Sequence, residues 1–185
     1  MKDYILEVCV DSVESALAAE RGGATRLELC ANLVIGGTTP GYPLFEQVKK
    51  ETGLPVRTLI RPRFGDFLYT QYEHRQMLQD IRHFAQAGAD GVVIGSLNAD
   101  GTLNTEQMQE MMEAAGSCAV TMHRAFDVCA DPFEALKKSA ELGVDTILTS
   151  GQEADCLAGC GLLKKLVQLT DQSRSDSHRV TILAG

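Results

Sequence analysis

The chain has 185 residues, of which 44% are hydrophobic, 23% charged and 5% aromatic, a composition typical of soluble globular proteins. Its 17 basic and 25 acidic side chains give a formal net charge of −8, so we expect no basic surface for nucleic acid. No apolar run reaches the roughly 18 residues that span a bilayer, and the charged, strand-like start does not resemble a signal peptide. These features predict a cytoplasmic protein with neither a nucleic-acid nor a membrane partner.

Cysteines are spread over the whole chain, at positions 9, 30, 118, 129, 156 and 160. In a small secreted protein six cysteines would indicate a disulfide framework. Here they lie mostly within apolar segments of a chain without an export signal. We therefore expect reduced thiols.

Short apolar runs alternate with longer segments of helical periodicity, the pattern of parallel βα units. The predicted strands are nearly continuous apolar runs, as buried parallel strands are. They cover Ile5–Val10, Arg26–Ala31, Val56–Arg61, Gly91–Ser96, Ala119–Phe126, Thr146–Ser150 and Val180–Ala184.

Helices are predicted between these strands, and several are followed by a glycine that suits a helix end. Asp11-Ser12 and Asp131-Pro132 are typical of helix starts. The predicted helices cover Val13–Arg21, Tyr42–Thr52, Glu73–Ala87, Thr105–Ala115, Pro132–Leu142 and Asp155–Thr170. The polar stretch Thr170–His178 is predicted to be a loop.

This alternation indicates an α/β fold that either closes into a barrel or forms an open doubly wound sheet, and the even spacing favours the barrel. We predict a single TIM-type (β/α)8 domain over residues 1–185. A complete barrel of this type has eight strands, whereas this chain ends with the seventh. We therefore expect a truncated product or fragment that lacks the C-terminal βα units, unless a partner chain covers the gap.

One four-residue pattern occurs twice: Leu6-Glu7-Val8-Cys9 in the first strand and Leu27-Glu28-Leu29-Cys30 in the second. Because side chains alternate along a strand, the glutamates and cysteines should point into the barrel while the apolar residues face the helices. If Cys9 and Cys30 lie near the same level, their sulfurs can share a soft ion, and two thiolates suit Cu(I) better than zinc. The alternative is that both are small buried hydrophobic residues.

Two further polar side chains follow predicted strands, Arg61 after the third and His123 in the fifth. A buried arginine needs a partner, so we expect Arg61 to pair with Glu7 or Glu28, either as an ionic layer or as an anchor for an anion. His123 suits a general acid or base, a metal ligand or a hydrogen-bonded core position. These four residues come from the ends of separate strands, as catalytic residues of barrels do.

Weaker signals have ordinary structural interpretations. Cys156 and Cys160 have the spacing of one helix face, and packing is the favoured role over metal binding. Three histidines, His74, His83 and His178, are predicted on helix or loop surfaces. A helix face that packs on the sheet is indicated by Met108, Met111 and Met112. Two loops offer hydroxyls and backbone amides to an anion or form ordinary turns, Gly36–Pro40 and Thr149–Gly151.

Six stretches of the sequence, taken together, resemble a known family. They are Leu6–Ser12, Gly22–Cys30, Gly36–Pro40, Ile60–Arg63 with Gly65–Phe67, His123–Asp127 and Leu148–Gly151. In this order they closely resemble the motifs of the CutC family, the copper homeostasis proteins, and the match covers the whole chain.

The resemblance implies a TIM-type barrel in the cytoplasm that forms dimers or higher homo-oligomers and serves copper homeostasis by binding copper. It places the copper-binding cysteines at Cys9 and Cys30. It implies no agreed catalytic activity, although the barrel mouth is enzyme-like. This chain departs from the family pattern after the seventh strand, where family members continue through a glycine-rich turn and at least one further βα unit.

Three functions therefore stay open. The first is Cu(I) binding by Cys9 and Cys30, with Glu7, Glu28, Arg61 and His123 tuning the local charge. The second is an enzyme for a small carbonyl or anionic substrate, with a glutamate as base, His123 as acid or electrophile and Arg61 as anion anchor. The third is a truncated chain without function.

Overall fold

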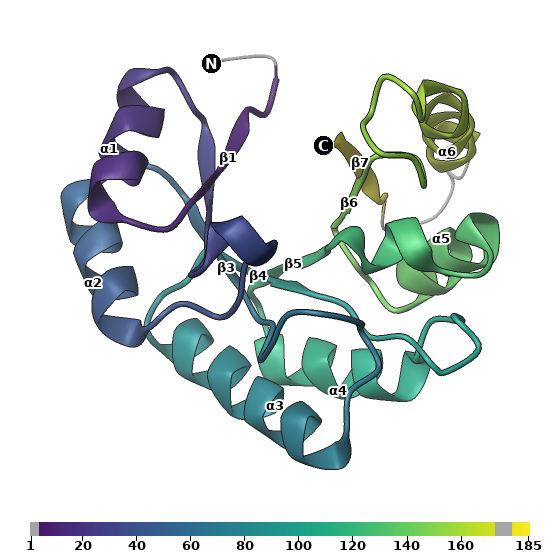
Figure 1. Ribbon diagram of the computed structural model, residues 1–185, viewed down its shortest axis with the longest axis horizontal. Helices are drawn as coiled ribbons and strands as arrows, with labels where there is room; N and C mark the ends of the chain where they lie inside the picture. The colour runs from purple at the N-terminus through teal and green to yellow at the C-terminus, as the bar shows by residue number, and fades with distance from the viewer. Residues whose placement is uncertain (1–3, 173–178) are drawn as a thin grey trace.

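The computed structural model describes residues 4–172 and 179–185, in which strands and helices alternate along the chain (Figure 1). Each strand has four residues. The strands are β1 Glu7–Val10, β2 Arg26–Leu29, β3 Val56–Leu59, β4 Gly91–Ile94, β5 Ala119–Met122, β6 Thr146–Thr149 and β7 Thr181–Ala184.

Six α-helices and two short 3-10 helices connect the strands in the described part of the chain. The α-helices are α1 Val13–Arg21, α2 Tyr42–Glu51, α3 Gln71–Gln86, α4 Thr105–Ala115, α5 Pro132–Glu141 and α6 Cys160–Gln172. The 3-10 helices are η1 Leu33–Ile35 and η2 Arg124–Val128. None of these helices is long and apolar enough to cross a membrane.

All neighbouring strands are parallel, and their order in the sheet, β1 to β7, is their order in the sequence. The sheet is curled, and the helices lie on its outer side (Figure 1). This confirms the predicted α/β fold of TIM type, here as seven strands in a half-barrel. β1 and β7 are the two outermost strands of the described sheet.

Local capping explains where several helices begin. The Ser12 side chain caps α1, and the Asp131 carboxylate accepts hydrogen bonds at the start of α5, as predicted. Thr70 and Glu73 form a capping box, so α3 begins at Gln71, two residues before the predicted start.

Most predicted elements are a few residues longer than those of the structure, and two of them have an end displaced by four residues or more. The strand predicted over 119–126 ends at Met122, because the next residue, His123, caps η2 by accepting a hydrogen bond from the backbone N–H of Ala125. The helix predicted over 155–170 begins only at Cys160, after a separate turn held by the Asp155 carboxylate. Cys156 therefore lies outside the helix that Cys160 begins, and the predicted shared helix face is wrong.

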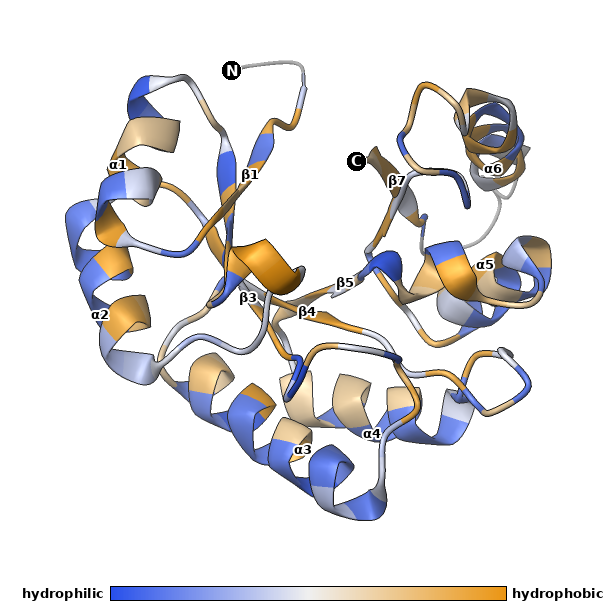
Figure 2. Ribbon diagram, in the orientation of Figure 1, coloured by the Kyte–Doolittle hydropathy of each residue, from blue (hydrophilic) through white to orange (hydrophobic). Residues whose placement is uncertain are grey.

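The main hydrophobic core fills the space between the sheet and the helices, and the helices in Figure 2 carry hydrophobic residues beside hydrophilic ones. Met108 and Met111 are fully buried in this core and Met112 packs against it, which confirms the predicted methionine face. A second, smaller cluster lies on the inner side of the curl and consists of Cys30, Leu59 and Val93.

The histidine predictions have different outcomes. His74 was predicted on the surface but is buried, and its Nε2 lies 2.8 Å from the Glu110 carboxylate on α4. His83 is exposed, as predicted. His178 lies outside the described residues, as does most of the predicted loop over 170–178, whose first three residues belong to α6.

Candidate functional site

The inner face of the first two strands carries the repeated glutamate and cysteine pattern, but the two copies are not level. In the β1–β2 ladder Glu7 is paired with Arg26, and Cys9 is paired with Glu28. The second copy is therefore shifted by two residues relative to the first, a stagger of the kind that barrel closure requires. The condition that Cys9 and Cys30 lie at the same level is not met, because Cys30 directly follows β2, one inward-facing position beyond Glu28.

A layer of charged and hydroxyl side chains fills the deeper part of the inner face. Arg26 Nε forms a short, largely buried ion pair with Glu7 Oε2. Arg57, on β3, donates from Nη1 to the hydroxyl of Thr121 and to that of Thr146 at 3.1 Å. Side chains of this layer therefore join β1 to β2, and β3 to β5 and β6.

Glu28 lies within this layer and is buried. Burial raises its pKa to about 8, and the negative charge of Glu7 raises it further, while Arg26 and Arg57 oppose the shift. Its Oε2 has no hydrogen-bond partner among the described residues. Near neutral pH this carboxyl group therefore holds a proton.

The two candidate thiols occupy different environments. Cys30 is buried, and its Sγ donates to the carbonyl of Val10 at 3.5 Å. Burial raises its pKa to about 12, with help from the carboxylates of Glu28 and Asp11. Cys9, on the outermost strand, keeps solvent exposure, but its surroundings and Glu28 also raise its pKa well above the ordinary value. Cys30 adds to that shift, which places the two sulfurs within electrostatic reach of each other.

Arg61 does not pair with the inward carboxylates of β1 and β2, and that prediction is wrong. Its Nη1 donates to the carbonyls of Gly36 at 3.2 Å and Gly37 at 3.1 Å, and its Nη2 donates to the carbonyl of Gly65 at 2.8 Å. The guanidinium thus joins the loop after β2 to the loop after β3. The loop at 36–40, for which an anion site and an ordinary turn were both left open, supplies carbonyl acceptors to this arginine.

His123 is buried directly after β5 and lies close to Arg61. Burial lowers its pKa to about 3, and the charge of Arg61 lowers it further. Its Nδ1 accepts the 3.2 Å hydrogen bond from the Ala125 backbone, so the neutral ring carries its proton on Nε2. The imidazole is therefore a hydrogen-bond donor at physiological pH.

The four predicted catalytic candidates form two groups rather than one. Glu7 and Glu28 lie in the deep layer, level with the start of β3, where Glu28 is paired with Arg57. Arg61 follows Arg57 by four residues, about 13 Å along an extended chain. The carboxylates and the Arg61–His123 pair are thus at different depths, and a reaction that needs all four side chains at one point is not supported by this arrangement.

Sequence reasoning missed the two arginines of the deep layer. Arg26 precedes Glu28 by two residues and Arg57 precedes Arg61 by four, so side-chain alternation assigns all of them to the inner face. That signal was present in the sequence. Their partners were not, because the pairing follows from the stagger between strands.

A second missed residue is Asp127, in η2. Its carboxylate accepts hydrogen bonds from the backbone N–H groups of Ser150 and Gln152 at 3.1 Å and from the Thr149 hydroxyl. Arg124 forms an ion pair with it at 2.7 Å. The hydroxyls and backbone amides of the loop at 149–151, for which an anion site and an ordinary turn were both left open, therefore already bind a carboxylate of the same chain.

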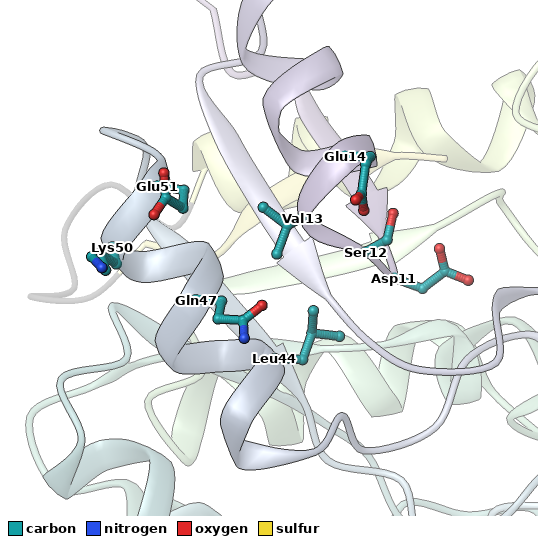
Figure 3. A pocket seen from close by; sticks show the side chains of 8 residues that line it. All are labelled: Asp11, Ser12, Val13, Glu14, Leu44, Gln47, Lys50 and Glu51. Carbon is teal, nitrogen blue, oxygen red and sulfur yellow. The ribbon is translucent and has the colours of Figure 1, made fainter.

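A surface pocket lies between the start of α1 and α2 (Figure 3). Asp11, Glu14 and Glu51 bring carboxylates to its lining and Lys50 brings an ammonium group, and all four are exposed. None of the predicted site residues lines this pocket. It does not extend the candidate site.

Within residues 4–172 and 179–185 no group of three or more histidine, cysteine, aspartate or glutamate side chains is arranged to hold a metal ion. Cys9 and Cys30 are a pair without a third ligand in the described chain. Such a set suits a soft, low-coordinate ion rather than tetrahedral zinc.

Comparisons with known proteins agree with one another. A family protein CutC from Bacteroides thetaiotaomicron is 50% identical over 186 residues, which cover 100% of this chain and 72% of that protein. The crystal structure of a candidate copper homeostasis protein CutC from Streptococcus agalactiae has a TM-score of 0.86 and 28% identity, covering 97% of this chain and 87% of that one.

A more distant solved structure shows the fold alone. Phosphoenolpyruvate phosphomutase from Streptomyces platensis subsp. rosaceus has a TM-score of 0.63 and 15% identity, covering 98% of this chain and 69% of that one. The CutC family model, in contrast, matches residues 4–185. The chain belongs to the CutC family.

Proposed function

We propose that this protein serves copper homeostasis by binding Cu(I) between the thiolates of Cys9 and Cys30. The observation that carries the proposal is their position on the inner face of neighbouring strands, within electrostatic reach of each other. Thiolates select Cu(I), zinc and iron–sulfur clusters, and a set of only two thiolates suits Cu(I) among these. The solvent exposure of Cys9 gives an ion a point of first contact, and the buried Cys30 supplies the second ligand.

The electrostatics of the site favour a cation over free thiolates. Both thiols have raised pKa values, so they are protonated at neutral pH without metal. A bound soft metal ion replaces those protons, because coordination deprotonates a thiol. The carboxylate of Glu7, which disfavours the Cys9 thiolate, adds negative potential that attracts the cation. Binding should therefore release protons and weaken as the pH falls.

The free thiols of the cysteines support a location in a reducing compartment. All six are free in the structure, and free thiols persist in the cytoplasm. We accordingly assign the proposed activity to the cytoplasm, where Cu(I) is the oxidation state that thiols stabilise. Assembly into homo-oligomers, which the family resemblance implies, belongs to the same proposal.

The test is an anaerobic Cu(I) titration of the whole chain in competition with a chromophoric Cu(I) chelator such as bathocuproine disulfonate. We expect one tightly bound Cu(I) per chain. Cys9→Ser and Cys30→Ser should each weaken binding at least tenfold, and the double variant should remove the site. Cys160→Ser is the matched control, since this exposed cysteine lies at the start of α6.

Unchanged stoichiometry and affinity in the double variant would exclude this site. Thermal unfolding of each variant, measured beside the titration, separates a lost ligand from a lost fold. An equal loss of binding in Cys160→Ser would point to unspecific thiol chemistry and also contradict the proposal.

A further inference from the structure

Two buried donor atoms without a partner lie at the carboxyl ends of β3 and β5. Arg61 is 8% exposed and His123 is 5% exposed. Arg61 Nε and His123 Nε2 have no hydrogen-bond partner among the described residues. Buried polar groups are almost always satisfied, because leaving one unpaired costs about 1–3 kcal/mol. Two such donors from neighbouring positions indicate a missing acceptor.

Strand geometry brings the two side chains to one level. The ladders pair Arg57 with Gly91 and Gly91 with Ala119. Four residues further along each strand, the same alignment sets Arg61, Gly95 and His123 in a row. The backbone hydrogen bond from His123 N to the Ile94 carbonyl, 2.9 Å, continues the pairing to this point.

Gly95 lets the imidazole lie across β4 towards Arg61. A Cβ at this position would lie 2.5 Å from His123 Cε1 and 2.7 Å from its Nδ1. Because Gly95 has no side chain, this position of the chain after β4 places nothing between the His123 ring and Arg61. The proximity of the two groups is also seen in the lowered pKa of the imidazole, to which Arg61 contributes.

The charge of Arg61 is not neutralised by a carboxylate of the described chain. Its side chain donates to three backbone carbonyls, and the Tyr69 hydroxyl lies beside it. The donor of His123 is fixed in direction, because the Ala125 N–H occupies Nδ1 and leaves the proton on Nε2. One uncompensated positive charge and two unpaired N–H groups thus face the same region.

Phe67 covers this pair. Its ring centroid lies 4.8 Å from that of His123 and 5.0 Å from Arg61 Cζ. The ring is only partly buried, and its loop neighbours Asp66 and Leu68 are exposed. The cover thus belongs to a surface loop, whereas the groups beneath it belong to the rigid ends of strands.

We infer that Arg61 and His123 form a binding site for the carboxylate group of a small molecule, reached by displacement of the Phe67 ring. The two donors match the two oxygens of a carboxylate, and the single uncompensated charge matches a monoanion. A phosphate group, with more oxygens and up to two charges, would leave acceptors unsatisfied between only two donors. The site is independent of the proposed copper site and shares no residue with it.

The test uses imidazole-selectively detected 1H–15N NMR of the whole chain, titrated with sodium acetate and, separately, with inorganic phosphate at equal ionic strength. We expect an Nε2-protonated His123 whose resonance shifts saturably with acetate and not with phosphate. Phe67→Ala removes the cover and should tighten acetate binding by about fivefold. His123→Leu should weaken it at least tenfold.

Controls separate the site from its surroundings. Arg75→Met removes an exposed arginine of α3 that lies outside the Phe67 loop and stacks on Tyr72, and it should leave acetate binding unchanged. The Cys9→Ser, Cys30→Ser double variant should also bind acetate normally, so failure here and failure of the copper proposal are distinguishable.

Several results would overturn the inference. A His123 ring protonated on Nδ1 removes the donor, and tighter binding of phosphate than of acetate contradicts the ligand class. If His123→Leu does not fold, the Phe67→Ala titration decides alone: no saturable acetate shift in that variant or in the parent chain rejects the site.

Discussion

Arg57 and Arg61 lie four residues apart on the same side of one strand, and their surroundings differ. Arg57 donates to two threonine hydroxyls across the curl and lies among the charges of Glu7 and Glu28. Arg61 donates to backbone carbonyls of two loops, has the Tyr69 hydroxyl beside it and retains an unpartnered Nε. The apolar cluster formed by Cys30, Leu59 and Val93 lies at intermediate positions along the strands.

The difference separates a structural charge from one that is available to a ligand. In the deep layer, Arg26 is paired with the Glu7 carboxylate and Arg57 lies near Glu7 and Glu28, so acidic groups of the protein offset part of the burial cost of these cations. At the carboxyl ends of the strands, the loops after β2 and β3 hold the Arg61 guanidinium in place without neutralising its charge. A site for an anion requires this second arrangement, and the first stabilises the half-barrel that presents it.

Breaking the deep layer should have the largest effect. Arg57→Met removes two hydrogen bonds to Thr121 and Thr146 and leaves the neighbouring carboxylates with less positive charge, so we expect a loss of ~3–4 kcal/mol in unfolding free energy. Arg61→Met should cost less, ~1–2 kcal/mol, because two of the three glycines whose carbonyls it releases, Gly36 and Gly65, are exposed and can bind water. Urea unfolding measures both. Equal losses would contradict the distinction between the two arginines.

Gly95→Ala should disturb the Arg61–His123 pair and leave the deep layer unchanged. The added methyl group would meet the His123 ring at 2.5 Å, which forces the imidazole or the backbone to move. We expect a loss of ~2 kcal/mol in unfolding free energy and weaker acetate binding. Gly161→Ala is the matched control. This helical glycine has open space around it, and alanine there should stabilise the chain by ~0.5 kcal/mol. A neutral Gly95→Ala would show that the imidazole does not depend on this glycine.

The protonated Glu28 predicts a pH dependence of the deep layer. Its folded-state pKa of about 8 lies above the ordinary 4.5, so its contribution to stability is complete below pH 4.5 and is lost as pH rises through 8. Relative to Glu28→Gln, the parent chain should lose at least ~1.4 kcal/mol between pH 5 and 8, the equivalent of one pKa unit. The contribution of His123 to stability has the opposite pH dependence. Because its pKa is lowered to about 3 in the folded chain, His123 favours unfolding as the pH falls below 6.5. It is present in both chains, so the difference between their unfolding curves isolates Glu28. Parallel curves would mean that this carboxyl is ionised in the folded protein.

The fold was predictable because it depends on local patterns. Buried parallel strands are continuous apolar runs, and residues such as Ser12 and Asp131 mark helix starts by hydrogen bonds to their own neighbours. The inward direction of Glu28, Cys30 and Arg57 also follows from alternation along one strand. Information of this kind does not depend on how distant segments meet.

The partners within the site were not predictable, because they depend on the stagger between strands and on loops. A two-residue shift pairs Glu7 with Arg26 instead of with the matching glutamate of β2. Arg61 finds its acceptors in two glycine-containing loops whose conformation no periodicity encodes. The end of β5 at Met122 follows from one side-chain hydrogen bond of His123.

The smallest expected effect concerns the chemical reactivity of Cys9, which is exposed and yet has a raised pKa. After burial, the charge of Glu28 is the strongest cause of that shift. Only the thiolate reacts with iodoacetamide. Glu28→Gln removes a carboxylate that is half ionised near pH 8, so alkylation of Cys9 should become about threefold faster at that pH, with a smaller gain at pH 6.5 where Glu28 is protonated. Peptide mass spectrometry resolves Cys9 from the exposed Cys160, whose rate should not change. An equal acceleration at Cys9 and Cys160 would assign the effect to loosening of the fold. A pH-dependent acceleration at Cys9 alone would mean that the charge of Glu28 acts on Cys9, the proposed metal ligand.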